Sequence, residues 1–290
     1  MNKKLMIILT ISIICSLGLG LLVGYFIPIG KANSKTLSSN KDGNVSSLET
    51  PKYITNSDTF KQSKTFKTDT KSIDKNDKLK YPSINPKNVK FTPKYSDELT
   101  KNIEIIDSVY VEGNFNASLQ VHAKNNNSIS ASIYFMLVFY DSNGKEVCTT
   151  YGNPGVFTFS NTEFAVELSL KSTKHYSSYE VIYYAREVDP KHQSFEEVKD
   201  VKYYIIQEGD GNINILFKNQ TDHDISGVAF STFLYKNGEL VWANSSLLSF
   251  ASEDIIPGTG GVAKVHAGLY NGIEYDDVKI VLTGAYKINK

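Results

Sequence analysis

The sequence predicts an all-β protein in which two tandem β-sandwich domains follow an apolar N-terminal helix and a polar tether. A stretch with strand, turn, strand character at residues 133–147 is repeated at residues 228–241. Around each copy, short apolar runs alternate with turn residues about every ten positions, which is typical of a sandwich of antiparallel sheets. The predicted segments are the helix at residues 1–30, the tether at 31–100, and the sandwiches at 101–190 and 200–290.

An uncharged apolar run at residues 5–29 follows Lys3 and Lys4. As a helix rising about 1.5 Å per residue, this run is long enough to cross the roughly 30 Å apolar core of a bilayer. We therefore expect a signal-anchor, or transmembrane, helix that makes a single pass through the cell membrane and leaves the C-terminal domains extracytoplasmic. The alternative is secretion after cleavage near Ala32, because Pro28 interrupts the helix and small residues surround that point.

The next segment, residues 31–100, is dominated by Ser, Thr, Asn, Lys and Asp and shows no lasting apolar periodicity. Such a segment cannot bury enough apolar surface to offset the entropy lost on ordering, so it is predicted to be a disordered tether. It holds 14 Lys and 8 acidic residues, whereas residues 101–290 hold 15 Lys and Arg and 23 acidic residues. The acidic C-terminal part argues against nucleic acid as a partner, since nucleic acid requires a basic surface.

The repeated stretch reads IYFMLVFYDSNGKEV in its first copy and VAFSTFLYKNGELV in its second. Residues 134–140 are all apolar or aromatic, which suits a pleated strand, and the run is too short for an independent helix. Both copies then reach a turn sequence, with Gly144 in the first and Asn237-Gly238 in the second. Asn-Gly is the favoured pair for a two-residue hairpin turn. Each copy therefore predicts a β-hairpin.

Further strands are predicted on both sides of the hairpins. Residues 118–123 and 212–217 alternate between polar and apolar, and each run leads into a Lys-Asn pair. Later apolar runs supply the remaining strands of two sandwiches of roughly 90 residues each. The junction between them is expected near residues 189–199, where Pro190 interrupts any regular element.

The order of these residues resembles the FxLYD-type domain of bacterial membrane-anchored envelope proteins, which is a small Ig-like β-sandwich. Lys236 stands where that pattern has Asp, and the first copy lacks the Pro-Gly turn. The resemblance implies two tandem Ig-like β-sandwich domains, and because its motif is one of packing and turns, it implies no catalytic residue. The residues that carry the resemblance are Phe135, Phe139, Tyr140, Asp141 and Gly144 in the first copy, and Phe230, Leu234, Tyr235, Gly238 and Pro257-Gly258 in the second.

Motifs of nucleotide-binding proteins and hydrolases are not found. Residues 258–264 look like a phosphate-binding loop, but Ala263 replaces the second glycine and Val265 replaces the Ser or Thr that would bind magnesium. There is no Gly-x-Ser-x-Gly elbow and no His-Glu-x-x-His motif. The sequence therefore predicts no enzyme activity, no catalytic residue, no nucleotide and no cofactor.

Metal ligands are scattered along the chain. Asp141 and Asp210 lie in turns whose oxygens could attract calcium, but neither turn is followed by the bidentate acid of a calcium loop. His122 and His266 fall on predicted strands, and His223 falls in a solvated turn. No metal site is predicted. With only two cysteines, at positions 15 and 148, neither sandwich can form an internal disulfide. Cys148 is predicted to be a strand residue, and the alternative is an exposed reactive thiol.

Aromatic residues offer the candidate ligand contacts, which are Trp242, Tyr235 and Tyr140. Trp242 is the single Trp and directly follows the second hairpin. One hypothesis is that such residues form a strand-face row that stacks on sugar rings; the other is that they fill the sandwich cores.

Together these features predict a non-catalytic cell-envelope protein that presents two β-sandwich binding or scaffold domains outside the membrane. The alternative is a carbohydrate- or cell-wall polymer-binding module that uses surface aromatics. The expected partners are the membrane, through residues 5–29, and a cell-wall polymer or another envelope protein. Frequent Lys, Asn, Ile and Tyr are typical of a Gram-positive source.

Overall fold

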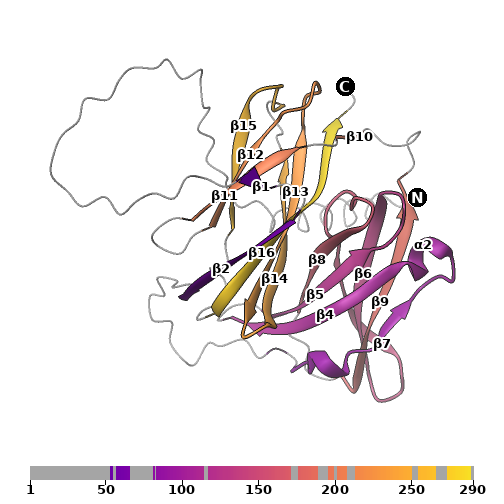
Figure 1. Ribbon diagram of the computed structural model, residues 1–290. Helices are drawn as coiled ribbons and strands as arrows, with labels where there is room; N and C mark the ends of the chain where they lie inside the picture. Colours follow the sequence, from indigo (N-terminus) through magenta and orange to yellow (C-terminus); the bar gives the residue numbers. More distant parts are fainter. Residues whose placement is uncertain are drawn as a thin grey trace, which may run out of the picture. The chain divides into compact units, whose positions relative to one another are not determined.

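The structure is a computed structural model. It describes residues 53–54, 57–65, 81, 83–113, 117–170, 176–188, 195–198, 201–207, 213–249, 254–265 and 273–288. Nearly all regular structure in these ranges is β-strand, which confirms the predicted all-β class (Figure 1). The apolar run at residues 5–29 and the alternative cleavage point near Ala32 lie outside the described residues. Among the described residues, no helix is long and apolar enough to cross a membrane.

The first pair of sheets contains the first repeat. Sheet I has the strand order β3-β9-β6-β7 and sheet II the order β4-β5-β8 (Figure 1). In sheet I, β3 runs parallel to β9 and the other pairs are antiparallel; sheet II is antiparallel throughout. The strands are β3 (Phe91–Pro93), β4 (Ile103–Glu112), β5 (Ala117–Asn125), β6 (Ala131–Tyr140), β7 (Glu146–Gly152), β8 (Thr162–Ser169) and β9 (Ser178–Glu187).

The second pair of sheets contains the second repeat. Sheet III has the order β10-β16-β13-β14, with β2 also paired to β16, and sheet IV has the order β1-β11-β12-β15. The strands are β1 (Tyr53–Ile54), β2 (Ser57–Thr65), β10 (Phe195–Glu197), β11 (Lys202–Gln207), β12 (Ile213–Lys218), β13 (Gly227–Lys236), β14 (Glu239–Ser249), β15 (Gly260–Val265) and β16 (Glu274–Ile288).

Each pair of sheets encloses its own hydrophobic core. Alternate residues of β6 and β5 point into the first core, as the period of two along a strand requires. The second core contains Trp242, Phe230 and Phe217, together with Tyr203, whose hydroxyl donates to Ile280 O at 3.2 Å. The inward residues of the first core include Leu119, Val121, Ile133, Phe135, Leu137, Phe139, Phe164 and Val166.

Both predicted hairpins are confirmed. β6 pairs with β7 across a turn in which Gly144 has φ +75°, and β13 pairs with β14 across Asn237 (φ +51°) and Gly238 (φ +81°). Positive φ at both central residues is the geometry for which Asn-Gly is favoured. In the first turn, Asp141 Oδ1 also accepts hydrogen bonds from Asn143 N and Lys145 N, at 2.8 and 2.9 Å.

The repeated Lys-Asn pairs place a buried Asn at the same point of each sheet pair. Asn125 Nδ2 donates to Thr158 O and Phe159 O at 3.2 and 3.0 Å. Asn219 Nδ2 donates to His223 O and Ile255 O, both at 2.7 Å. Each amide therefore connects the end of a strand to a segment more than thirty residues away, which explains why the Asn recurs in the sequence.

Ordered elements occur inside residues 31–100, where a disordered tether was predicted. They are β1, β2, β3, the short helices η2 (Pro86–Asn88) and α2 (Glu98–Lys101), and the buried Ile84. β2 pairs with β16 and β3 with β9, so these segments extend existing sheet edges. Strand addition of this kind is driven by backbone hydrogen bonds and needs no apolar period, so composition does not reveal it. The first folded region consequently begins before residue 101, and the second, through β10, before residue 200.

Sheets II and III pack against each other. Ala165 on β8 contacts a small cluster formed by Phe233, Ala243 and Val281 of sheet III. As a result β5 is buried along both of its faces, although its alternating sequence predicted a half-buried strand. The packing order through the described part of the chain is therefore sheet I, II, III, IV.

Candidate functional site

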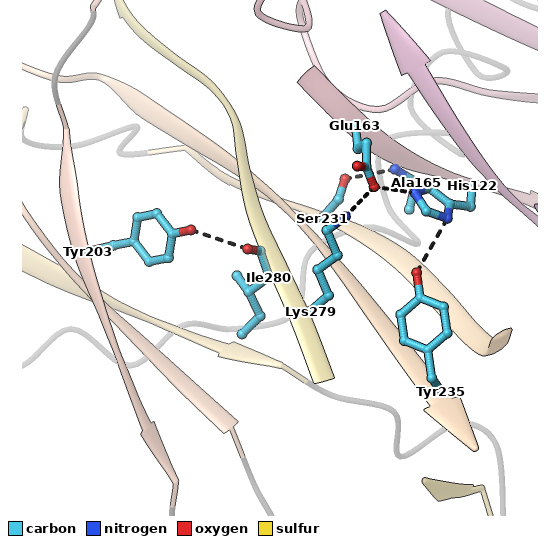
Figure 2. Close-up of polar contacts among 8 residues, drawn as sticks. All are labelled: His122, Glu163, Ala165, Tyr203, Ser231, Tyr235, Lys279 and Ile280. Carbon is cyan, nitrogen blue, oxygen red and sulfur yellow. Dashed lines mark hydrogen bonds and ion pairs between the residues drawn. The ribbon is translucent and has the colours of Figure 1, made fainter. Parts of the chain in front are cut away.

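A cluster of ionisable side chains lies where sheets II and III meet (Figure 2). It combines His122 of β5, Glu163 of β8, Tyr235 of β13 and Lys279 of β16. His122 Nε2 lies 2.7 Å and Lys279 Nζ 2.5 Å from the same oxygen, Glu163 Oε2. The Tyr235 hydroxyl lies 3.5 Å from the other imidazole nitrogen, Nδ1 of His122. The four side chains thus form one continuous chain of polar contacts.

Strand alternation directs His122 into this junction. Its neighbours Val121 and Ala123 point into the first core, so the imidazole points toward sheet III and is only 4% exposed. There its ring centroid lies 4.1 Å from that of Phe233. Because one face of the imidazole is apolar and both nitrogens have partners, the side chain is fixed in orientation.

The electrostatics of the cluster keep Glu163 ionised. The hydrogen bond from His122, followed by the contacts with Lys279, lowers the pKa of Glu163 to about 2, although burial opposes this shift. Burial raises the pKa of Tyr235 to about 12, and the charges of Glu163 and Asp107 add to this effect. At neutral pH the carboxylate is therefore charged and the phenol is protonated.

This arrangement is suited to holding two sheets together rather than to proton transfer. A carboxylate with a pKa of about 2 is a weak base, and its Oε2 atom already faces two donors. Among the described residues, no group of three or more His, Cys, Asp or Glu side chains could hold a metal ion. We therefore assign the cluster a structural role.

A second set of contacts at the junction satisfies the backbone of two edge strands. Ala165 N on β8 donates to Ser231 Oγ at 2.8 Å (Figure 2). Ala165 O accepts from Ser245 Oγ at 2.6 Å. In return, Ala243 N on β14 donates to Gln120 Oε1 at 2.7 Å. Unpaired edge groups are costly when buried, so each sheet pair completes the hydrogen bonding of the other.

The predicted ligand contacts lie in three different places. Trp242 is 1% exposed and belongs to the second core, where its side chain serves packing. Tyr235 lies in the junction between sheets II and III. Tyr140 is half-buried on the outer face of sheet I, where its hydroxyl donates to Glu180 Oε1 at 2.9 Å. The structure does not bring these three residues together.

A different group of aromatic residues gathers on the outer face of sheet I. Tyr134 of β6 and Tyr184 of β9 are cross-strand partners whose rings stack with centroids 4.9 Å apart and planes inclined by 18°. Tyr95 meets Tyr184 edge-on at 5.5 Å. Lys94 Nζ and the Arg186 guanidinium each lie 5.1 Å from the centre of the Tyr184 ring. We call these five residues the tyrosine face.

Local structure explains how the tyrosine face is formed. Ile133 and Phe135 point into the first core, so Tyr134 between them points outward. Lys94 N donates to Tyr183 O at 2.8 Å, which holds the segment after β3 beside β9. Tyr95 is 41% exposed, and Tyr151, which lies opposite Met136 on the same outer side, is 72% exposed.

The sequence contains part of the signal for the tyrosine face. Because side chains alternate along residues 133–140, Tyr134 points to the face of the strand away from the core, whereas Phe135 points into the core. The pairing with Tyr184 depends on the register between β6 and β9, and these strands lie about forty residues apart in the sequence. Comparisons with known proteins add no further constraint: neither a scan against protein-family models nor a search of curated proteins gives a match.

Proposed function

We propose that the chain is a non-catalytic cell-envelope protein that presents two tandem Ig-like, FxLYD-type β-sandwich domains outside the membrane. In this proposal the first domain binds an envelope component through the tyrosine face. The observation that carries it is the stack of Tyr134 and Tyr184 with Lys94 and Arg186 over the second ring. Aromatic and Arg side chains are the residues that most often dominate binding surfaces.

The junction between sheets II and III supports presentation of both domains as one unit. Direct hydrogen bonds join Gln120 to β14 and Ala165 to β13 and β14. A binding surface gains affinity when it is held rigidly, because less freedom is lost on association. The membrane helix at residues 5–29 and the remaining tether are the parts that would hold this unit in the envelope.

Two measurements on the full-length chain test the proposal. Protease treatment of intact cells is expected to release fragments from the region of residues 101–290, since the domains would lie outside the membrane. Purified cell walls are expected to co-sediment the wild-type chain but not the Tyr134→Ala/Tyr184→Ala variant. Complete protection of the domains in intact cells, or equal sedimentation of wild type and variant, would contradict the proposal.

A further inference from the structure

We infer that the tyrosine face binds an anionic polysaccharide, that is, a sugar polymer carrying carboxylate or phosphate groups. This inference rests on the proposed function and specifies its ligand class. It extends the tyrosine face to Tyr151, which lies on the neighbouring strand β7.

The cations of the tyrosine face point to an anionic ligand. Lys94 and Arg186 are both exposed, and within the described residues neither forms an ion pair. Nearby, Lys90 has a carboxylate partner, since its Nζ lies 3.5 Å from Glu180 Oε2. The quadrupole of the Tyr184 ring attracts both of these charges, each of which lies 5.1 Å from the ring centre. A guanidinium in such a position can bind a carboxylate or phosphate through two parallel hydrogen bonds.

The aromatic side chains point to a sugar. Tyrosine combines an apolar ring with a polar hydroxyl, and a pyranose likewise combines apolar C–H faces with hydroxyl groups. Tyr95 and Tyr151 are the most exposed aromatic rings of this outer face, at 41% and 72%. Burying an exposed ring against a sugar removes apolar surface from water without any conformational change of the sheet.

The register of sheet I places these groups along one continuous surface. Tyr184 and Tyr134 lie side by side on β9 and β6, and the next outward pair is Ile182 and Met136. On the other side of β6, Met136 pairs with Tyr151 of β7. Because neighbouring strands lie about 4.8 Å apart, the surface from Lys94 to Tyr151 crosses the whole width of the sheet and can contact several sugar units.

The test measures binding of the purified full-length chain to defined polymers. Polygalacturonate and a phosphomannan supply sugar carboxylates and sugar phosphates, methyl-esterified polygalacturonate removes the charge, and polyglutamate removes the sugar. We expect binding to at least one of the two anionic polysaccharides, and binding weaker by roughly tenfold or more for the neutral ester and for polyglutamate. The polymer that binds more tightly identifies the anionic group.

Substitutions test whether the polymer binds at the tyrosine face. Lys94→Gln/Arg186→Gln should weaken binding by roughly tenfold or more, because a hydrogen bond to a charged group contributes about that factor. Tyr151→Ala should weaken it several-fold, whereas Lys218→Gln, an exposed cation of sheet IV, should leave it unchanged. All substituted residues are exposed, and unchanged thermal unfolding of each variant confirms that the fold is retained.

Four results would overturn the inference. Equal binding of the ester, equal binding of polyglutamate, or full binding by Lys94→Gln/Arg186→Gln would each remove the anionic sugar as the ligand. If no defined polymer binds while purified walls still sediment the chain in a manner that depends on Tyr134 and Tyr184, this inference fails and the proposed function stands. Loss of wall sedimentation as well would mean that both fail.

Discussion

At the scale of single residues, two kinds of polar group hold the molecule together: buried asparagine amides and a half-buried carboxylate. Asn125 and Asn219 connect strand ends to loop carbonyls within each sheet pair. Glu163 of the first pair connects to the second pair through Lys279, and its other partner, His122, lies beside it in the first pair. The amides gain most of their effect from burial, because a buried carbonyl that loses its partner is left unsatisfied.

Replacing Asn125 by Ala tests the first kind. The substitution removes the donor for Thr158 O and Phe159 O and should lower the free energy of unfolding by about 2–3 kcal/mol. The neighbouring Asn126 is exposed, so Asn126→Ala should change stability by less than about 0.5 kcal/mol. Urea denaturation of both variants measures the difference, and equal stability of the two would refute the structural role of the buried amide.

The pH dependence of stability tests Glu163. Its pKa in the folded chain is about 2, below its ordinary value of 4.5, so its contribution is fully present above pH 4.5 and is lost as the pH falls toward 2. Solvent screening limits the contribution to on the order of 1–2 kcal/mol. In Glu163→Gln, the free energy of unfolding should fall less steeply between pH 4.5 and pH 2 than in the wild type. Glu98→Gln, at an exposed helix position, should follow the wild-type curve; identical slopes for all three chains would exclude the predicted linkage.

At the scale of elements, the turn residues of the hairpins recur in the sequence because the backbone geometry of the turn requires them. Gly238 has φ +81° and no atom lies within 4 Å of where its Cβ would be, so its role in the second hairpin is purely conformational. Gly227 is different: a Cβ there would lie 2.3 Å from Cζ of Tyr286. The two glycines belong to the same strand pair and can be compared directly.

Gly238→Ala should destabilise the chain by about 1 kcal/mol, because a residue with a Cβ rarely adopts positive φ. Gly227→Ala should destabilise it by about 2–3 kcal/mol, since the methyl group collides with the Tyr286 ring. Thermal or urea unfolding gives both values. A larger effect at Gly238 than at Gly227 would show that the turn, and not the ring contact, limits the stability of β13.

Elements that depend on partners distant in sequence were harder to predict. The hairpins were predicted correctly because apolar runs and turn residues lie next to each other. β2 was missed because pairing with β16 uses backbone groups and leaves no pattern in residues 57–65. The sequence allowed two hypotheses for Trp242, a surface contact with sugars or packing in the core. Its position next to a hairpin turn predicts a strand but does not predict the face to which the indole points. Tyr184 was missed because only the register with β6 places it beside Tyr134.

At the scale of the described fold, the contacts between sheets II and III determine whether the two sheet pairs behave as one unit. Edge-strand backbone groups of β8 and β14 are satisfied across this junction, and Phe233 packs into it. The sequence predicts β5 to be half-buried and does not reveal this contact, because Gln120 and His122 are polar side chains typical of a solvent-facing strand surface. Polar residues on a strand indicate a second face without specifying whether water or another sheet covers it.

Calorimetry of the full-length chain tests this coupling. We expect one cooperative unfolding transition for both sheet pairs, since separating them exposes unsatisfied backbone groups. Ser231→Ala/Ser245→Ala removes the hydroxyls that serve Ala165 and should lower the transition temperature or split the transition. Two separate transitions in the wild type would mean that the junction contributes little.

The central claim is that the protein acts by binding through the tyrosine face, and oxidative footprinting of the full-length chain on purified cell walls tests it most directly. Mass spectrometry would compare the oxidation of exposed side chains with and without walls. We expect protection of Tyr95 and Tyr151 of the first sheet pair, and unchanged oxidation of Ile256 and Val262, which are exposed in the second. Unprotected tyrosines, with protection confined to Ile256 and Val262, would contradict it.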